Sequence, residues 1–258
     1  MSNIRMIVSP DLQVAAYEIT NQICSSRNIR AVVIAAQCAI DERWRKALAV
    51  FGNRCPVAVV RGFAREKDKA MQTDSRIIFI TPGCVGRLLI NSEIKTDVLV
   101  LDDLERLIAI REEFRNNISL FTHSVTQTIG ITHRFNENHL RYIPRELRIM
   151  GLENMMQLSP GAFYERYYFR NYIKDEKGNT VCRFELKPGA IEAVQRFLEE
   201  ICDLRMIDRA EAESIETSGH EDYIPLDYKE KSKYRFINRL REEKIHGSGI
   251  GHYNEEYL

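Results

Sequence analysis

Two adjacent carboxylates, Asp102 and Asp103, follow directly after the apolar run Val98–Leu101. An apolar run of this kind predicts a fully buried strand of a parallel sheet, with both carboxylates at its carboxyl end. Ligands bind at that edge of open α/β sheets. In an enzyme that hydrolyses a nucleotide, such a pair holds a magnesium ion and orients a water molecule. The alternative is that the two carboxylates are solvated and cap the helix that follows.

The first strand-to-helix turn, at 8–13, is the place where this kind of fold binds phosphate. A phosphate-binding turn is rich in glycine and ends in Lys-Ser/Thr, and neither feature is present. Ser9 is predicted to cap the helix, with Pro10 at its first position and Asp11 in its first turn. The charge of Asp11 would stabilise the positive helix end and repel a phosphate. We therefore expect a degenerate phosphate turn, with no bound cofactor and no metal.

The elements that must position these residues alternate between short apolar runs and amphipathic stretches. This alternation predicts an α/β fold with a mostly parallel sheet and helices on both faces. Trp44, the only tryptophan, is expected to pack in the core. The expected strands are Ile4–Val8, Ala31–Ala35, Val57–Arg61, Ile77–Thr81, Asp97–Asp102 and Thr126–Thr132. The expected helices are Gln13–Cys24, Asp41–Phe51, Ala64–Met71, Val85–Ile90 and Glu112–His123.

Three parts are expected along the chain. Residues 1–138 form the α/β domain, and residues 139–204 form a helical and β-hairpin extension packed on it. The hairpin is predicted at Tyr167–Ile173 and Thr180–Leu186, followed by a helix that runs to Leu204. Aromatic residues interleave with Arg166 and Arg170 there, which favours either nucleobase stacking or, preferably, core packing. Residues 205–258 are expected to be an acidic loop, a charged helix and a flexible tail.

The composition limits the classes of function. The chain has 258 residues, with 37 Lys and Arg against 37 Asp and Glu. A strong nucleic-acid binder usually has a basic excess, so nucleic-acid binding would need a local patch. The six cysteines are scattered and predict buried, reduced thiols rather than a metal site. Without a long apolar run or a signal-peptide pattern, the expected location is cytoplasmic, with no membrane partner.

The order of these elements resembles the first RecA-like domain of superfamily 2 helicases, specifically the phage SNF2-like type of DNA helicase. The resemblance covers nearly the whole chain and implies a RecA-like fold, although each motif is degenerate. Its strength lies in the order and spacing of the motifs. The matching stretches are Val33–Gln37 with Trp44 downstream, Phe79–Thr81, Val100–Arg106, Ile129–Phe135, Tyr164–Phe169, Glu185–Ala190 and Ile224–Leu240.

The departures from this family concern the hydrolysis of ATP. The glycines and lysine of the phosphate loop are missing at Ser9–Gln13, and Asp103 stands where the family has a catalytic glutamate. The Thr-Gly-Thr-Pro turn is replaced by Thr132–Phe135, and a second RecA-like domain is not expected in this sequence. Phosphoryl transfer depends on positioning and charge neutralisation. The chain is therefore expected not to be an enzyme, and no residue is assigned a catalytic role.

Two functions remain open, and the sequence favours neither of them strongly. In the first, a catalytically inactive helicase-like protein binds a protein partner, such as a helicase, nuclease or polymerase complex. It would then be a viral decoy or inhibitor of a host helicase or defence complex, in the host cytoplasm. In the second, it is a non-enzymatic DNA- or RNA-binding accessory factor in viral replication, recombination or transcription. A third alternative, an ATPase completed by a domain in trans, is disfavoured by the turn at Ser9–Asp11. The candidate nucleic-acid-binding residues are Arg134, Arg141, Arg145, Arg148, Lys231, Lys233 and Arg235.

Overall fold

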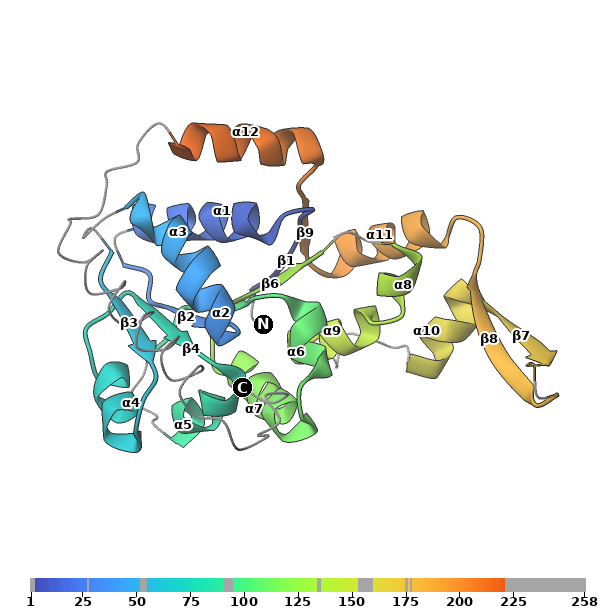
Figure 1. Ribbon diagram of the computed structural model, residues 1–258, viewed down its shortest axis with the longest axis horizontal. Helices are drawn as coiled ribbons and strands as arrows, with labels where there is room; N and C mark the ends of the chain where they lie inside the picture. Colours follow the sequence, from blue (N-terminus) through green and yellow to red (C-terminus); the bar gives the residue numbers. More distant parts are fainter. Residues whose placement is uncertain are drawn as a thin grey trace, which may run out of the picture.

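The protein folds around one large sheet, and a separate two-stranded hairpin lies beyond α10 at one end of the molecule (Figure 1). The computed structural model describes residues 3–26, 28–51, 55–90, 95–133, 136–152, 160–174, 176 and 178–220. The charged helix expected at 228–244, with Lys231, Lys233 and Arg235, lies outside this part of the chain. Arg134 lies outside it as well.

The main sheet has seven parallel strands, and the hairpin is a separate antiparallel pair. The strands are β1 (Asn3–Val8), β2 (Ala31–Ile34), β3 (Val57–Val60), β4 (Ile77–Ile80), β5 (Val98–Leu101), β6 (Gln127–Thr132), β7 (Tyr168–Lys174), β8 (Thr180–Leu186) and β9 (Asp203–Met206). In the main sheet their order is β3-β4-β2-β5-β6-β1-β9. The strands β2, β4 and β5 are buried along their whole length, as continuous apolar runs predict.

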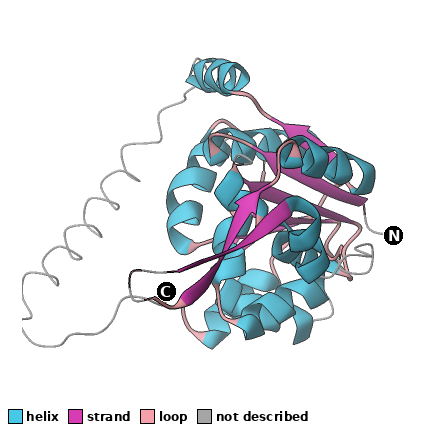
Figure 2. Cartoon of the chain, turned by 90° about the vertical axis from the view of Figure 1, so that its right-hand side faces the viewer, coloured by secondary structure: helices cyan, strands magenta, loops and turns pink. Residues whose placement is uncertain are grey.

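Helices cover both faces of this sheet, which confirms the predicted α/β architecture (Figure 2). They are α1 (Leu12–Ser25), α2 (Gln37–Ala39), the π-helix η1 (Ile40–Trp44), α3 (Arg45–Ala49), α4 (Ala64–Met71), the 3-10 helix η3 (Pro82–Cys84), α5 (Val85–Ile90), α6 (Leu104–Ala109), α7 (Glu112–Thr122), α8 (Glu137–Leu140), α9 (Ile143–Ile149), α10 (Pro160–Tyr167), α11 (Ala190–Ile201) and α12 (Arg209–His220).

Two hydrophobic cores lie on opposite faces of the sheet. One packs α1, η1, α3 and α12 against the sheet, and it includes Trp44, whose ring centroid lies 5.7 Å from that of Phe79. Trp44 is completely buried, so the predicted core role is confirmed. The other core packs α5, α6, α7, α9, α10 and α11 against the opposite face. The first part of the extension is thus joined to the α/β unit by a continuous apolar core.

The sequence prediction is wrong for the segment that follows α11. That helix ends at Ile201 rather than Leu204, and β9 then joins the main sheet beside β1. The described part of the expected acidic loop at 205–223 contains the end of β9 and α12 instead. The strand was missed because Asp203–Met206 is a short, partly exposed edge strand without an apolar run. The division of the chain at 138 and 204 remains a prediction.

Two further expectations concern cysteines and aromatic residues. All six cysteines are free thiols. The predicted burial is confirmed for Cys55 and Cys84, whereas Cys24 and Cys202 are partly buried and Cys38 and Cys182 are exposed. In the aromatic stretch, Phe163 and Tyr167 are buried in the core, whereas Phe169 is exposed on the hairpin. Core packing therefore holds for the helical half of that stretch and for Tyr168 at the start of β7, but not for Phe169, the next residue of that strand.

Candidate functional site

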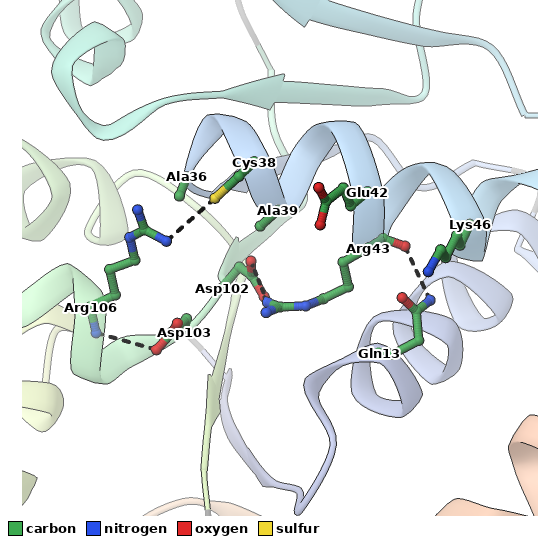
Figure 3. Close-up of a pocket in the computed structure, with 10 residues that line it drawn as sticks. All are labelled: Gln13, Ala36, Cys38, Ala39, Glu42, Arg43, Lys46, Asp102, Asp103 and Arg106. Atoms are coloured by element: carbon green, nitrogen blue, oxygen red, sulfur yellow. Dashed lines mark hydrogen bonds and ion pairs between the residues drawn. The ribbon is translucent and has the colours of Figure 1, made fainter. Parts of the chain in front are cut away.

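The carboxylate of Asp102 lies at the carboxyl edge of the sheet and is almost completely buried, with 2% of its surface exposed. Its backbone N–H donates to the carbonyl of Ile34, which extends the pairing of β5 with β2 by one residue. The side chain accepts two hydrogen bonds from Nη1 of Arg43, at 2.7 Å to Oδ1 and 2.9 Å to Oδ2 (Figure 3). The predicted carboxylate is therefore held in a buried ion pair.

Arg43 comes from the π-helical turn η1, which follows β2 and α2. Single π-helical turns inside α-helices are often found at functional sites, because they change the direction of the side chains. Burial raises the pKa of the Asp102 carboxyl, and the charge of Arg43 opposes that rise. Sequence reasoning missed Arg43, because an arginine within an amphipathic stretch carries no signal for a partner 59 residues away.

Asp103 has a different role from its neighbour. It adopts a left-handed backbone conformation with φ 58°, and its side chain accepts a hydrogen bond of 3.3 Å from the backbone N–H of Arg106. Asp103 is thus the N-cap of α6, which agrees with the alternative that a carboxylate here caps the next helix. The guanidinium of Arg106 lies 3.4 Å from the Cys38 sulfur across the pocket.

The first strand-to-helix turn is capped differently from the prediction. Asp11, not Ser9, is the N-cap of α1, and its carboxylate accepts a 2.7 Å hydrogen bond from the backbone N–H of Gln13. Pro10 lies before the helix instead of at its first position. The buried Ser9 hydroxyl donates to the carbonyl of Asp11 and fixes the turn. The acidic side chain still occupies the positive end of α1.

These parts line one pocket of about 230 Å³ between α1, the α2–η1–α3 stretch and the start of α6 (Figure 3). Gln13 lines the pocket from α1, and its side-chain amide donates to the backbone carbonyl of Arg43. The lining contains three cationic and three acidic side chains: Arg43, Lys46, Arg106, Glu42, Asp102 and Asp103.

The resemblance to helicases implies a magnesium–nucleotide complex, and the residues of this pocket do not fit that group. Both Asp102 oxygens already accept from a guanidinium, which holds the place next to the carboxylate that a cation would take. Asp11 places a negative charge where a phosphate would meet the helix N-terminus. Among the described residues, no group of three or more His, Cys, Asp or Glu side chains is arranged to hold a metal ion.

A second polar cluster is buried behind the end of β6. Nε2 of His139 lies 2.8 Å from Oε1 of Glu146 and 3.1 Å from the hydroxyl of Thr132. Burial alone would lower the pKa of His139, but Glu146 and the nearby charge of Glu105 raise it on balance. Burial also raises the pKa of Glu146. The sequence analysis did not anticipate this cluster, which joins β6 to α8 and α9.

The described basic candidates lie apart from the pocket. Arg145 and Arg148 are exposed on α9, and Arg141 is exposed just before it. Arg145 and Arg148 are three residues apart and therefore lie on one side of α9, whereas Arg141 is in the turn between α8 and α9. Arg141 also lies over the ring of Tyr142, 4.6 Å from its centroid. The structure thus brings two of the seven candidates, Arg145 and Arg148, together on α9, places Arg141 in the preceding turn, and describes none of the other four.

Comparisons with known proteins give structural matches only. No family model and no curated protein matches the chain. The chain is similar to the SWI2/SNF2 ATPase core of Sulfolobus solfataricus in complex with dsDNA, at 15% identity and a TM-score of 0.51, over 96% of this chain and 50% of that chain. The same organism's SWI2/SNF2 ATPase core domain gives 14% identity and a TM-score of 0.49, over 81% and 41%.

A DEAD-box domain gives a weaker match. Domain 2 of Mss116p bound to an RNA duplex is 8% identical with a TM-score of 0.42, over 87% of this chain and 70% of that chain. The chain spans half or less of the SWI2/SNF2 cores that it matches. It shares the RecA-like α/β fold of the dsDNA-bound SWI2/SNF2 core, and the α/β fold class is as predicted. No helix among the described residues is long and apolar enough to cross a membrane.

Proposed function

We propose that this chain is a helicase-like protein that binds nucleic acid and does not hydrolyse nucleotides. The observation that carries the proposal is the buried ion pair between Arg43 and Asp102. A guanidinium on this carboxylate supplies internally the positive charge that magnesium supplies in a nucleotide hydrolase. Asp11 likewise supplies a negative charge at the N-terminus of α1. The charges at this edge of the sheet are therefore neutralised by the chain's own side chains, without a nucleotide or a metal ion.

Two observations support nucleic acid as the partner. Arg145 and Arg148 are exposed on one side of α9 and Arg141 is exposed in the turn before it; together these residues, the α9 stripe, give the local basic patch that a protein of zero net charge needs. The SWI2/SNF2 core with a similar fold is in complex with dsDNA. Phosphate contacts from arginine side chains require no sequence recognition and are sensitive to salt. We therefore expect binding to duplex nucleic acid without strong sequence preference.

A protein partner is the second candidate function. Phe169, Ile173 and Val181 are exposed on one face of the hairpin, between 43% and 49% each. Apolar groups gathered on a surface commonly mark protein interfaces. An inhibitor of a helicase or nuclease complex, in a viral or other setting, would use such a face. The interaction would then survive nuclease treatment, which distinguishes it from co-purification through nucleic acid.

Calorimetric titration with magnesium-ATP and magnesium-ADP tests the nucleotide part of the proposal. The expected result is no heat of binding at millimolar nucleotide, for the native chain and for Asp102→Asn alike. Micromolar binding that Asp102→Asn abolishes would contradict the proposal. The test concerns binding alone, so it does not depend on a second motor domain.

Anisotropy titration of a labelled DNA duplex over a series of salt concentrations tests the partner. Removing two phosphate contacts with Arg145→Ala/Arg148→Ala should reduce the slope of log K against log salt by about 1.8. The matched control is Arg65→Ala/Lys69→Ala, which removes two exposed cations from α4, far from α9 (Figure 1). An equal effect of both double variants would reject the α9 stripe as the interface.

A further inference from the structure

The hairpin of β7 and β8 extends beyond the helices that cover the sheet (Figures 1 and 2). Its register pairs Arg170 with Phe184 and Tyr172 with Cys182. Side chains alternate between the two faces of a strand, so these four residues share one face. Lys174 and Thr180 continue that face at the tip, and Tyr168 and Leu186 lie at its base.

The two faces of the hairpin differ in charge. The Tyr172 face has two cations, Arg170 and Lys174, and no carboxylate at any of its eight paired positions. The opposite face carries Glu185, which accepts a hydrogen bond from Asn171. Cations beside aromatic rings, without carboxylates, suit a ligand that presents phosphates and flat bases. The opposite face also has a cation, Arg183, and an exposed ring, Phe169, with Lys187 Nζ 5.5 Å from the ring centroid, but it differs by carrying the Glu185 carboxylate.

Two exposed rings on the Tyr172 face are available to a ligand. Tyr172 is 66% exposed and Phe184 is 44% exposed. Phe184 is held in place by Tyr164 and Tyr168, whose ring centroids lie 5.3 Å and 6.4 Å from its own. The Arg170 guanidinium lies over the Phe184 ring, 5.7 Å from its centroid. The Phe184 ring is thus preorganised, and a cation adjoins it.

The spacing of the positions that carry the two rings bears on whether a single strand or a duplex binds here. Tyr172 and Phe184 are diagonal neighbours across the strand pair, a relation that separates their backbone positions by about 7–8 Å. Bases within one strand of a duplex repeat every 3.4 Å or so. Two successive bases that stack on rings carried at these positions are further apart than in a duplex, so the spacing favours an unpaired, extended strand.

We propose that the Tyr172 face of the hairpin binds single-stranded nucleic acid, with one base stacked on Tyr172, the next on Phe184, and phosphates contacted by Arg170 and Lys174. This inference rests on the proposed function, and it adds a single-strand site distinct from the α9 stripe. The binding is independent of sequence, because every base offers a flat face to the rings.

The test uses a fluorescein-labelled oligothymidylate and a labelled duplex, titrated with the full chain. Tyr172→Ala should weaken oligothymidylate binding by about 5- to 150-fold, the loss of one base stack. Duplex binding should change less than about twofold, and Tyr172→Phe should bind oligothymidylate as the native chain does. Ile173→Ala is the matched control, because Ile173 is exposed on the opposite face of the same strand.

The outcomes separate this inference from the proposed function. If the duplex binds and Tyr172→Ala leaves oligothymidylate affinity unchanged, the hairpin site is overturned and the proposed function stands. If neither probe binds, both are overturned. Both Tyr172→Ala and Ile173→Ala could instead weaken the binding of the chain to itself or to another protein and leave its affinity for oligothymidylate unchanged. In that case the hairpin is a protein interface and the single-strand site is overturned. Unchanged circular dichroism and Trp44 fluorescence show that each variant is folded.

Discussion

Replacing Arg43 by methionine tests the buried ion pair directly. The variant keeps most of the side-chain length but leaves Asp102, of whose side chain 1% is exposed, without its cation. Breaking a buried pair from one side costs about 3–5 kcal/mol. Because the Arg43 side chain is 22% exposed, water can partly solvate the site, and we expect the lower end, about 3 kcal/mol.

Urea unfolding followed by the fluorescence of Trp44 measures this change. Trp44 is the only tryptophan and is completely buried, so its emission reports unfolding of the core. With a slope of about 3 kcal/mol per molar urea, the midpoint should fall by about 1 M. The control is Arg45→Met, two residues further on, which removes a 3.4 Å ion pair to Asp41 that is more than one third exposed on both sides. Such pairs contribute about 0–1 kcal/mol.

Two further arms identify the cause of the loss. Arg43→Met/Asp102→Leu should recover most of the stability, because a buried pair replaced by apolar groups is often neutral. In Arg43→Met the pKa of Asp102 rises further, since the opposing cation is gone. The penalty should therefore be largest at neutral pH and shrink as the pH falls through that raised pKa. A midpoint shift no larger than that of Arg45→Met would refute the reasoning.

Three other predictions follow from the same structure. The pKa of His139 is raised in the folded state, so protonated His139 stabilises the fold below the ordinary histidine pKa, and this stabilisation is lost as the pH rises through the raised pKa. The urea midpoint should therefore fall as the pH rises. Glu146→Gln should flatten this pH dependence, because it removes the carboxylate that raises the pKa of His139. Gly130→Ala should cost about 1–3 kcal/mol in urea unfolding, because the new Cβ would lie 2.7 Å from the Met150 sulfur, and adding Met150→Ala should restore part of the loss. Asp11→Ala should lower the free energy of unfolding by about 0.5–2 kcal/mol, because α1 loses its N-cap. If Asp11→Ala binds inorganic phosphate more tightly than the native chain does, the turn before α1 is a phosphate site that Asp11 blocks.

The main sheet could be predicted because its signal is local. The runs at β2, β4 and β5 contain only apolar residues, and buried parallel strands require that composition. The helices α4 and α5 begin and end where their apolar spacing predicted. Asp102 was correctly expected at the carboxyl edge, because a strand that ends in a carboxylate has to deliver it there.

The contacts that define the site could not be predicted, because they join distant parts of the chain. Arg43 meets Asp102 across 59 residues, and β9 pairs with β1 almost 200 residues away. Neither contact leaves a pattern in the local sequence. The N-cap was assigned to Ser9 because serine and aspartate are both good caps, and only the backbone geometry distinguishes them.

The central claim is that the chain binds nucleic acid without using a nucleotide. Its most direct test is an anisotropy titration of one labelled duplex with and without magnesium-ATP, with phosphate release measured in the same samples. The account predicts superimposable binding curves and no phosphate release. A curve shifted by magnesium-ATP, together with phosphate release that Asp102→Asn abolishes, would contradict it.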